Sequence, residues 1–423
     1  MISLWKWRLL ALVRKLWVRA TLYALMGVVA ALLAALAQRL LPGDLGSGLG
    51  ASSVETILTI LASSMLAVTT FSLGIMVSAL SGAAQAATPR AVALLMQDGT
   101  TQNVMATFLG AFRCSLVGII ALKAGIYSAS GRLVLFAVTL VMVAIIVVTM
   151  LRWIAHLSDF GRMRDVLGRV EAAAEAAMRV RMEAPYLGGH PRRGPRPADA
   201  VPIYPGQVGY VQHLDSGALQ AAAEAAGLQV HVEALPGAFV TPAAPLCFLV
   251  GQAQAADPAR FAGAFRIGAV RGFDQDPRFG LCVLTEIASR ALSPAVNDPG
   301  TAIDVIGRAV RLLSLWAGPR EITLRHPRLW VPEIRVQDMF EDVFRPIARD
   351  GAGLVEVQMR LHKALGVLAR LDPEDFGPAA ARLSDEALLR AEAALTIEPD
   401  RALLRALNSA VHGDPSAPPA RGI

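Results

Sequence analysis

The sequence predicts a mainly α-helical membrane protein, with four transmembrane helices followed by a cytoplasmic region that contains a small α+β module and a helical domain. Of its 423 residues, 54% are hydrophobic and 17% are charged, against roughly 25% charged residues in soluble proteins. Residues 1–200 hold 19 Lys and Arg against 9 Asp and Glu, whereas residues 201–423 hold 21 against 25. The basic surplus therefore belongs to the hydrophobic half, and the mildly acidic second half argues against nucleic-acid binding.

The N-terminal segment, residues 1–19, is basic and carries three tryptophans. Such an amphipathic segment is typical of the cytoplasmic membrane interface. We do not expect a signal peptide, because no convincing small-residue cleavage site follows the first apolar stretch and further apolar stretches come after it.

A four-helix transmembrane domain is expected over residues 20–155. The second span lies in a charge-free run, residues 57–87, which as a single helix would be about 46 Å long. Because the hydrocarbon core is about 30 Å thick, this helix must tilt, protrude or break, and Gly82 is the candidate break point. The expected spans are residues 20–41, a stretch within 57–87, residues 104–127 and residues 133–151.

The loop charges predict the orientation of these spans. Four arginines follow the last span within residues 152–169, whereas residues 42–53, between the first two spans, contain no Lys or Arg. The positive-inside rule then places both termini in the cytoplasm. Lys123 and Arg132 oppose this orientation weakly. We therefore expect a multi-pass protein of the inner (plasma) membrane.

One face of the second span is built from small and polar residues spaced three and four apart, and we call it the polar stripe. Its members are Thr59, Ser63, Ala67, Thr70, Gly74, Ser78, Ser81 and Gln85. Two interpretations are open. The stripe can pack closely against another helix, as small-x-x-x-small interfaces do, or it can line a water-filled pore in an oligomer.

Arg113 lies near the middle of the third expected span. A cation at this depth is costly and usually faces protein or water. No Asp or Glu lies at a comparable depth in any expected span. We expect Arg113 to bond to hydroxyls and carbonyls of neighbouring helices, or to an anion in a cavity.

The remainder of the chain divides by composition. Six prolines between 185 and 205 mark an exposed linker, and alternating apolar residues after Gly227 indicate a strand. The expected parts are a helical stalk over 156–183, a Pro-rich linker over 184–205, a small α+β module over 206–255, a helical cytoplasmic domain over 261–410 and a tail over 411–423. Within the module we expect a strand over 207–213, a helix over 216–226, and strands over 228–234 and 246–250.

The most distinctive motif lies at the start of the helical domain, and we call it the cytoplasmic motif. It consists of Asp274, Gln275, Asp276, Arg290, Ser293, Asn297, Asp298 and Thr301. Asp276-Pro277 and Asp298-Pro299 are typical of helix starts. Because helix N-termini attract anions and several arginines lie nearby, the motif can bind a small anionic ligand or form an interface. The alternative is helix capping with structural ion pairs.

Recognisable enzyme motifs are missing from the sequence. It has no P-loop, no G-x-S-x-G elbow and no H-E-x-x-H. Its three cysteines form no C-x-x-C pair, and its seven histidines include no i,i+4 pair. We therefore expect a protein that is not an enzyme, with no catalytic residues, no cofactor and no metal site.

Several strings together resemble a known family. They are the run from Arg290 to Ala302 (R-A-L-S-P-A-x-N-D-P-x-T-A), Asp274-Gln275-Asp276, Phe279-Gly280, Thr70-Phe71-Ser72-Leu73, Gly209–Gln212 and the turn at Pro236. This pattern resembles the bacterial predicted membrane proteins of the domain-of-unknown-function family 2254, over about residues 15 to 395. The resemblance implies an inner-membrane protein with a C-terminal cytoplasmic region. It implies no activity and no catalytic residues, and Arg113 matches none of these strings.

Two functional hypotheses follow. The first is a non-enzymatic homo-oligomer in the lipid bilayer that acts as a gated ion or solute conduit, with a cytoplasmic sensing domain. The second is a membrane-anchored signalling or scaffold module that binds a protein or a small anionic ligand through its cytoplasmic domain. Membrane-bound hydrolysis has no support from a triad or a metal motif.

Overall fold

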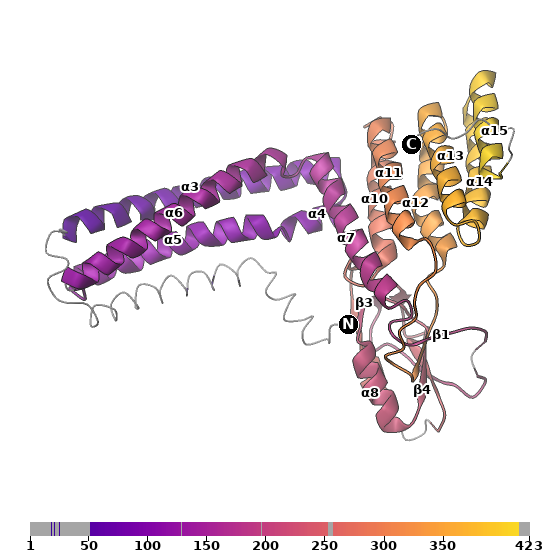
Figure 1. Ribbon diagram of the computed structural model, residues 1–423, viewed down its shortest axis with the longest axis horizontal. Coiled ribbons are helices and arrows are strands. Elements are labelled where there is room, and N and C mark those ends of the chain that lie inside the picture. The colour runs from indigo at the N-terminus through magenta and orange to yellow at the C-terminus, as the bar shows by residue number, and fades with distance from the viewer. Residues whose placement is uncertain are drawn as a thin grey trace. The chain divides into compact units, whose positions relative to one another are not determined.

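The computed structural model forms two compact units that meet in sequence between Val166 and Leu167 (Figure 1). The expected N-terminal segment, the first expected span and most of the expected tail lie outside the described residues. The structure describes residues 51–127, 129–195, 197–252 and 257–413, together with Val18, Thr21 and Leu25.

The first unit consists of helices. Three of them are long and apolar enough to cross a membrane, over Ser52–Gln85, Gly99–Lys123 and Gly131–Asp159. They correspond to the second, third and fourth expected spans. The helices of this unit are α3 (Ala51–Ala86), α4 (Pro89–Met96), α5 (Gly99–Lys123) and α6 (Ala129–Asp159).

Helix α3 runs without interruption through Gly82, so of the three alternatives a break there is excluded, and tilting or protrusion remains. A single glycine costs a helix only about 1 kcal/mol relative to alanine, which is too little to interrupt a long apolar helix. With 36 residues, α3 is about 54 Å long at 1.5 Å per residue. It ends where Thr88 caps α4 and Pro89 occupies the first turn of that helix.

Helix α5 is the most buried of the three. Half of its apolar window is buried, against 17% for α3 and for α6. Phe108 lies in the core between the helices, with Met65 of α3 and Ile146 of α6. In the same core, Trp153 donates a hydrogen bond to Ser72 over 3.0 Å. α3 and α6 therefore leave most of their surfaces open to other contacts.

The last span and the segment expected as a helical stalk, residues 156–183, are not one continuous helix. Helix α6 ends at Asp159, and a new helix, α7 (Met163–Glu183), begins after a turn. Gly161 adopts a positive φ of 78° at this turn, and its N–H donates to the Asp165 carboxylate over 3.2 Å. A left-handed residue ends an α-helix, which the sequence pattern alone did not reveal.

The second unit contains two sheets. One has the strand order β1-β8-β4-β6-β2 and the other β5-β3-β7. The strands are β1 (His190–Pro191), β2 (Val201–Ile203), β3 (Gly209–Leu214), β4 (Gln229–Val232), β5 (Phe239–Val240), β6 (Cys247–Val250), β7 (Phe265–Gly268) and β8 (Leu329–Val331). The two short helices associated with them are α8 (Ser216–Ala226) and α9 (Pro258–Ala262).

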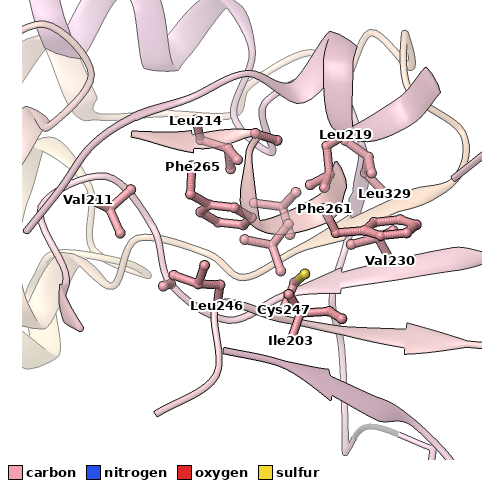
Figure 2. Packing of buried hydrophobic residues seen from close by; sticks show 14 of the residues in the cluster. Ile203, Val211, Leu214, Leu219, Val230, Leu246, Cys247, Phe261, Phe265 and Leu329 are labelled. Carbon is pink, nitrogen blue, oxygen red and sulfur yellow. The ribbon is translucent and has the colours of Figure 1, made fainter. Parts of the chain in front are cut away.

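These sheets extend beyond the residues expected for the α+β module. Two strands, β1 and β2, come from the segment expected to be a linker, and β7 and β8 come from within the residues expected for the helical domain. β8 pairs in parallel with both β1 and β4. Strands of two or three residues show no periodicity, so their assignment depends on partners that are distant in the sequence. The core between the sheets and α8 includes Leu219, Val230 and Phe265 (Figure 2).

The remaining helices form a layered bundle. α10 packs against α11 and α12, α13 against α11 and α14, and α15 against α13 and α14. Buried phenylalanines of α12 pack edge to face within this bundle. The helices are α10 (Pro277–Ala291), α11 (Pro299–Trp316), α12 (Val336–Asp350), α13 (Val355–Leu371), α14 (Gly377–Ala394) and α15 (Glu398–Val411).

Candidate functional site

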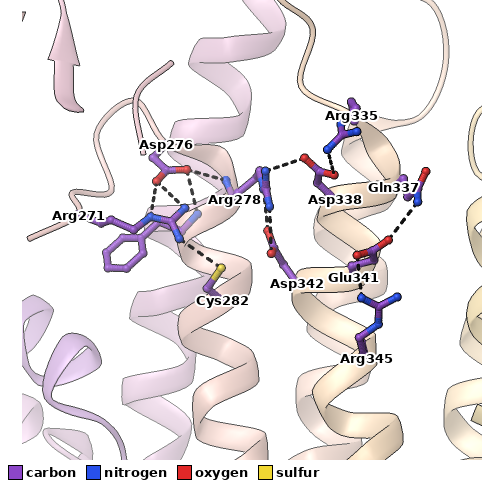
Figure 3. A network of polar contacts seen from close by, with 11 residues as sticks. Arg271, Asp276, Arg278, Cys282, Arg335, Gln337, Asp338, Glu341, Asp342 and Arg345 are labelled. Atoms are coloured by element: carbon purple, nitrogen blue, oxygen red, sulfur yellow. Dashed lines mark hydrogen bonds and ion pairs between the residues drawn. The ribbon is translucent and has the colours of Figure 1, made fainter. Parts of the chain in front are cut away.

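Asp276 caps the N-terminus of α10. Its Oδ1 accepts hydrogen bonds from the N–H groups of Arg278 and Phe279 over 3.1 and 3.2 Å. Its Oδ2 pairs with Arg271, at 2.8 Å from Nε and 2.7 Å from Nη2 (Figure 3). Burial raises the pKa of Asp276, and the Arg271 charge opposes that rise. Both oxygens are thus engaged by the protein itself.

The turn at Pro236 lies directly on this carboxylate. Gly237 has a φ of +94°, and a Cβ atom there would lie only 2.1 Å from Asp276 Oδ2. Its N–H donates to the carbonyl of Val211 over 2.8 Å. Only glycine combines this backbone conformation with so close an approach. The turn at Pro236 and the string that contains Asp276 are far apart in the sequence, but they meet at the Asp276 carboxylate.

The two residues before Asp276 have different environments. Gln275 is buried, and its Oε1 accepts from the N–H of Leu214 over 2.8 Å. The amide thereby bonds to the backbone at the end of β3. Asp274 is exposed. Gln275 is therefore a structural residue that joins the start of α10 to the smaller sheet.

The other half of the cytoplasmic motif shapes the connection from α10 to α11. Asp298 caps α11 by accepting from Thr301 N over 3.1 Å and from Thr301 Oγ1 over 2.6 Å, and these bonds lower the pKa of Asp298. Ser293 Oγ donates to the carbonyl of Arg290 over 2.7 Å. Asn297 takes a positive φ of 49° within the turn.

The cytoplasmic motif is therefore two clusters and not one site. Asp274, Gln275 and Asp276 precede α10, whereas the residues from Arg290 to Thr301 lie at its far end. The 15 residues of α10 separate the clusters by about 22 Å at 1.5 Å per residue. Helix capping, which the sequence left as the alternative, accounts for Asp276 and for Asp298.

The arginines near Asp276 also have protein partners. Arg278 reaches α12, where Nε lies 2.7 Å from Asp342 Oδ2 and Nη1 lies 2.8 Å from Asp338 Oδ2 (Figure 3). Arg271 lies over the Phe279 ring, 4.9 Å from its centroid. Neither side chain is free to hold an external anion.

Sequence reasoning missed a buried arginine on α7. The side chain of Arg181 is 2% exposed, and none of its three guanidinium nitrogens has a hydrogen-bond partner in the described structure. Burial lowers its pKa to about 10, and the charge of Asp276 opposes this shift. A signal existed in the sequence, because Arg181 follows the buried Ala174 and Ala177 at helical spacing and so lies on the apolar face of α7.

A buried serine–histidine pair was also missed. His362 Nδ1 lies 2.7 Å from Ser384 Oγ, and Ser384 donates to Asn408. Both side chains are fully buried, and desolvation lowers the pKa of His362 to about 4. A nucleophile needs access to its substrate, so this pair, although its spacing fits a Ser–His dyad, is part of the packing between α13, α14 and α15.

The first unit contains a buried acidic residue at the start of α5. Asp98 Oδ2 accepts from Thr101 Oγ1 over 2.6 Å and lies 3.0 Å from Nε2 of His156 on α6. The His156 ring stacks on Trp153, with 5.7 Å between ring centroids. This cluster links the ends of two membrane helices and was not expected from the sequence.

The polar stripe lies on the exposed side of α3. Every one of its members is exposed, whereas Leu58, Met65 and Ser72 of the same helix are buried against the other helices. The hydroxyl of Thr70 donates to the carbonyl of Leu66 over 3.0 Å, and other stripe hydroxyls bond within α3 in the same way. Within the described helices the stripe therefore makes no packing interface.

Arg113 is exposed on α5. No hydrogen bond or ion pair connects it to another of the described residues, so the expected contacts with hydroxyls of α3 are absent there. It shares the exposed side of its helix with Leu116 and Ile120. A cation thus lies on an otherwise apolar surface.

Other features offer little chemistry. No group of three or more His, Cys, Asp or Glu side chains that could hold a metal ion occurs in the described ranges. An open hollow of about 550 Å³ beside β2 is lined by Pro, Ala, Tyr204 and Phe248 and carries no charged side chain. These surfaces supply neither a nucleophile nor a general base.

Comparison with known proteins gives the family. Uncharacterised proteins of Mycobacterium tuberculosis and Mycobacterium bovis are 40% identical over 116 residues, which are 26% of this chain and 22% of theirs. The matched segment is thus about a fifth of the length of these curated relatives. No solved structure matches the chain. The family model described as "Predicted membrane protein (DUF2254)" matches residues 13–366, and the chain therefore belongs to this family of predicted membrane proteins.

Proposed function

We propose that the protein is a non-enzymatic, oligomeric protein of the inner membrane that forms a gated conduit for an ion or a small solute. In this proposal, residues 20–41 supply a fourth span, both termini are cytoplasmic, and the unit from Leu167 onward controls the conduit. The observation that carries the proposal is the exposed position of Arg113 in the middle of a membrane helix.

The cost of an unpaired charge in hydrocarbon supports this proposal. A cation at the bilayer centre costs at least about 2.5–3.5 kcal/mol, and such residues face a water-filled cavity or another protein surface. The described helices do not shield Arg113. A water path between subunits would hydrate it, and its charge would then favour anions along that path.

The polar stripe is compatible with a conduit, but it is equally compatible with close packing against another helix. Because stripe hydroxyls already donate to carbonyls of α3, the stripe can face water or a closely packed helix without leaving a donor unsatisfied. Its exposure on α3 leaves this face available to a further helix or subunit. The exposed position of Arg113 is therefore stronger support for a conduit than the stripe is.

Ion flux through the purified, full-length protein in liposomes tests the conduit. We expect Arg113→Leu and Thr70→Leu to change the flux rate or the selectivity by about tenfold or more, because each removes a polar group from the path. Lys123→Leu is the matched control, since it removes one cation from the same helix at its end, where Lys123 pairs with Glu55 over 3.1 Å. Equal flux in Arg113→Leu and the parent protein would contradict the proposal.

A second candidate function is a membrane-anchored binding module. The observation that favours it is the buried, unpartnered guanidinium of Arg181, which lies in the second unit and is independent of the membrane helices.

A further inference from the structure

Three side chains of the second unit carry buried donor groups without acceptors among the described residues, and we call Arg181, Trp316 and Arg320 the donor cluster. Five of its nitrogens are buried without a hydrogen-bond partner in the described chain: Nε, Nη1 and Nη2 of Arg181, Nε1 of Trp316 and Nε of Arg320. Every one of these atoms carries N–H and can only donate. The cluster therefore lacks acceptors.

Trp316 and Arg320 are held together. The guanidinium carbon of Arg320 lies 4.0 Å from the centroid of the Trp316 ring, and Nη2 donates to the Trp316 carbonyl over 2.6 Å. Arg320 acts electrostatically on Arg181, and the two like charges oppose each other. The charges of Glu333, Asp372 and Asp375 act on Arg320 in the opposite sense, but no ion pair joins Arg320 to any of them within the described residues.

None of the described residues supplies the missing acceptor. Asp276 is the carboxylate whose charge acts on Arg181, yet its oxygens are already bonded to Arg271 and to the N–H groups that begin α10. Tyr186 also acts on Arg181 electrostatically, and burial raises the pKa of its hydroxyl. Tyr186 is therefore neutral at physiological pH and cannot balance the charge.

Another buried arginine of the same unit, Arg308, is paired with carboxylates. Arg308 is 9% exposed, and its guanidinium pairs with Glu171 over 2.6 Å and with Asp304 over 3.1 Å. A buried charge is normally paired in this way, because leaving it unpaired costs several kcal/mol. Arg181 is more buried than Arg308 and has no such pair.

We propose that the donor cluster binds one small oxyanion, a phosphate or carboxylate group, with Arg181 as its main ligand. The planar fork of a guanidinium matches two oxygens of either group, and Arg320 and Trp316 supply further N–H donors. Arg320 is partly exposed, so the anion enters along this side chain. The site is independent of the proposed conduit, because it lies wholly within the second unit.

Thermal unfolding of the full-length protein in detergent tests the site. We expect inorganic phosphate or acetate to raise the Tm above that in chloride of equal ionic strength, because a ligand of the folded state stabilises it. Arg181→Met keeps most of the aliphatic stem and removes the donors, so its Tm should not respond. The acetate arm and the phosphate arm separate the two oxyanion classes.

Arg308→Met is the matched control. It removes a buried, paired arginine from the same unit, so we expect a lower Tm in every buffer with the phosphate response intact. Loss of the response in Arg308→Met as well as in Arg181→Met would point to a damaged fold. In that event, Arg181→Lys, which keeps the charge, should restore part of the response if the site binds an anion.

An anion that stays bound through purification would hide the Tm response. We therefore also measure oxyanions released on denaturation by ion chromatography and mass spectrometry. We expect about one per chain from the parent protein and from Arg308→Met, and several-fold less from Arg181→Met. Neither a Tm response nor a released oxyanion, or an equal result for Arg181→Met and the parent protein, would overturn the proposal.

Discussion

The carboxylate of Asp276 is fully occupied by hydrogen bonds and contacts within the protein. It caps α10, pairs with Arg271 and lies against Gly237, where no side chain fits. A carboxylate with this many fixed partners has no free lone pair for a ligand. At the residue scale, the groups that fit binding are those left without partners among the described residues, and in the second unit these include the donors of Arg181, Trp316 and Arg320.

His362 predicts a pH dependence of stability. Burial lowers its pKa from 6.5 to about 4, so the unfolded chain binds a proton that the folded chain does not. Stability is then fully present above pH 6.5 and falls as the pH drops toward 4, by about 3 kcal/mol in all. Urea unfolding between pH 4 and 7 measures this loss.

An asparagine at this position isolates the effect. His362→Asn can keep a hydrogen bond to Ser384 but does not titrate, so we expect most of the loss between pH 6.5 and 4 to disappear. His412→Gln is the control, because His412 is an exposed histidine that contacts Asp385 of the same network. The interpretation fails if His362→Asn retains the full pH dependence of the parent protein.

At the scale of elements, helix α3 has two different faces. One is buried against α5 and α6 through residues such as Leu58 and Met65, and the other is the exposed polar stripe. Helical spacing in the sequence was sufficient to place the stripe on one face. It could not show which face meets α5, because that depends on apolar contacts between segments that are far apart in the chain.

Cysteine accessibility tests the environment of the stripe. Cysteines at Ser63, Thr70 and Ser78, in a Cys282→Ser background, should react with a water-soluble thiol reagent at least about tenfold faster than a cysteine at Phe71. Phe71 is exposed on the same helix but outside the stripe, and we expect it to face lipid. Equally slow reaction at all four positions would show that the stripe packs against a helix.

Elements with local signals were predictable from the sequence, and elements without them were not. Gly227 ends α8 in the left-handed conformation, and Asp276 and Asp298 begin their helices with a following proline. These signals lie within a few residues of the elements they define. β1 and β8 have no such signal, because each exists through hydrogen bonds to a strand far away in sequence.

At the scale of the whole molecule, the sequence separated a hydrophobic first part from a polar second part, and the structure divides at Val166. Three spans lie in the described residues. The candidate site was predictable only in part: the capping roles of Asp276 and Asp298 followed from the residues, whereas the donor cluster did not. Its members come from α7, α11 and the segment after α11, and only folding brings them together.

The number of spans determines on which side each terminus lies. Four spans place both termini on the same side of the membrane, which is the cytoplasm in the proposed topology, whereas three place them on opposite sides. We expect cysteines at Ile2 and Gly422 to be labelled by an impermeant reagent in inverted vesicles but not in intact cells. A cysteine at Ile126, between α5 and α6, is the control and should show the reverse. Opposite labelling of Ile2 and Gly422 would contradict the four-span topology.

The parallel pairing of β1 with β8 has a consequence for biosynthesis. β1 leaves the ribosome early, and its partner strand follows only after residues 192–328 have been made. Until then, the larger sheet lacks the strand that joins β1 to β4, and its edges are open to wrong partners. Folding of this sheet must therefore wait for late synthesis, and a nascent chain that stalls before β8 is a natural substrate for chaperones and proteases.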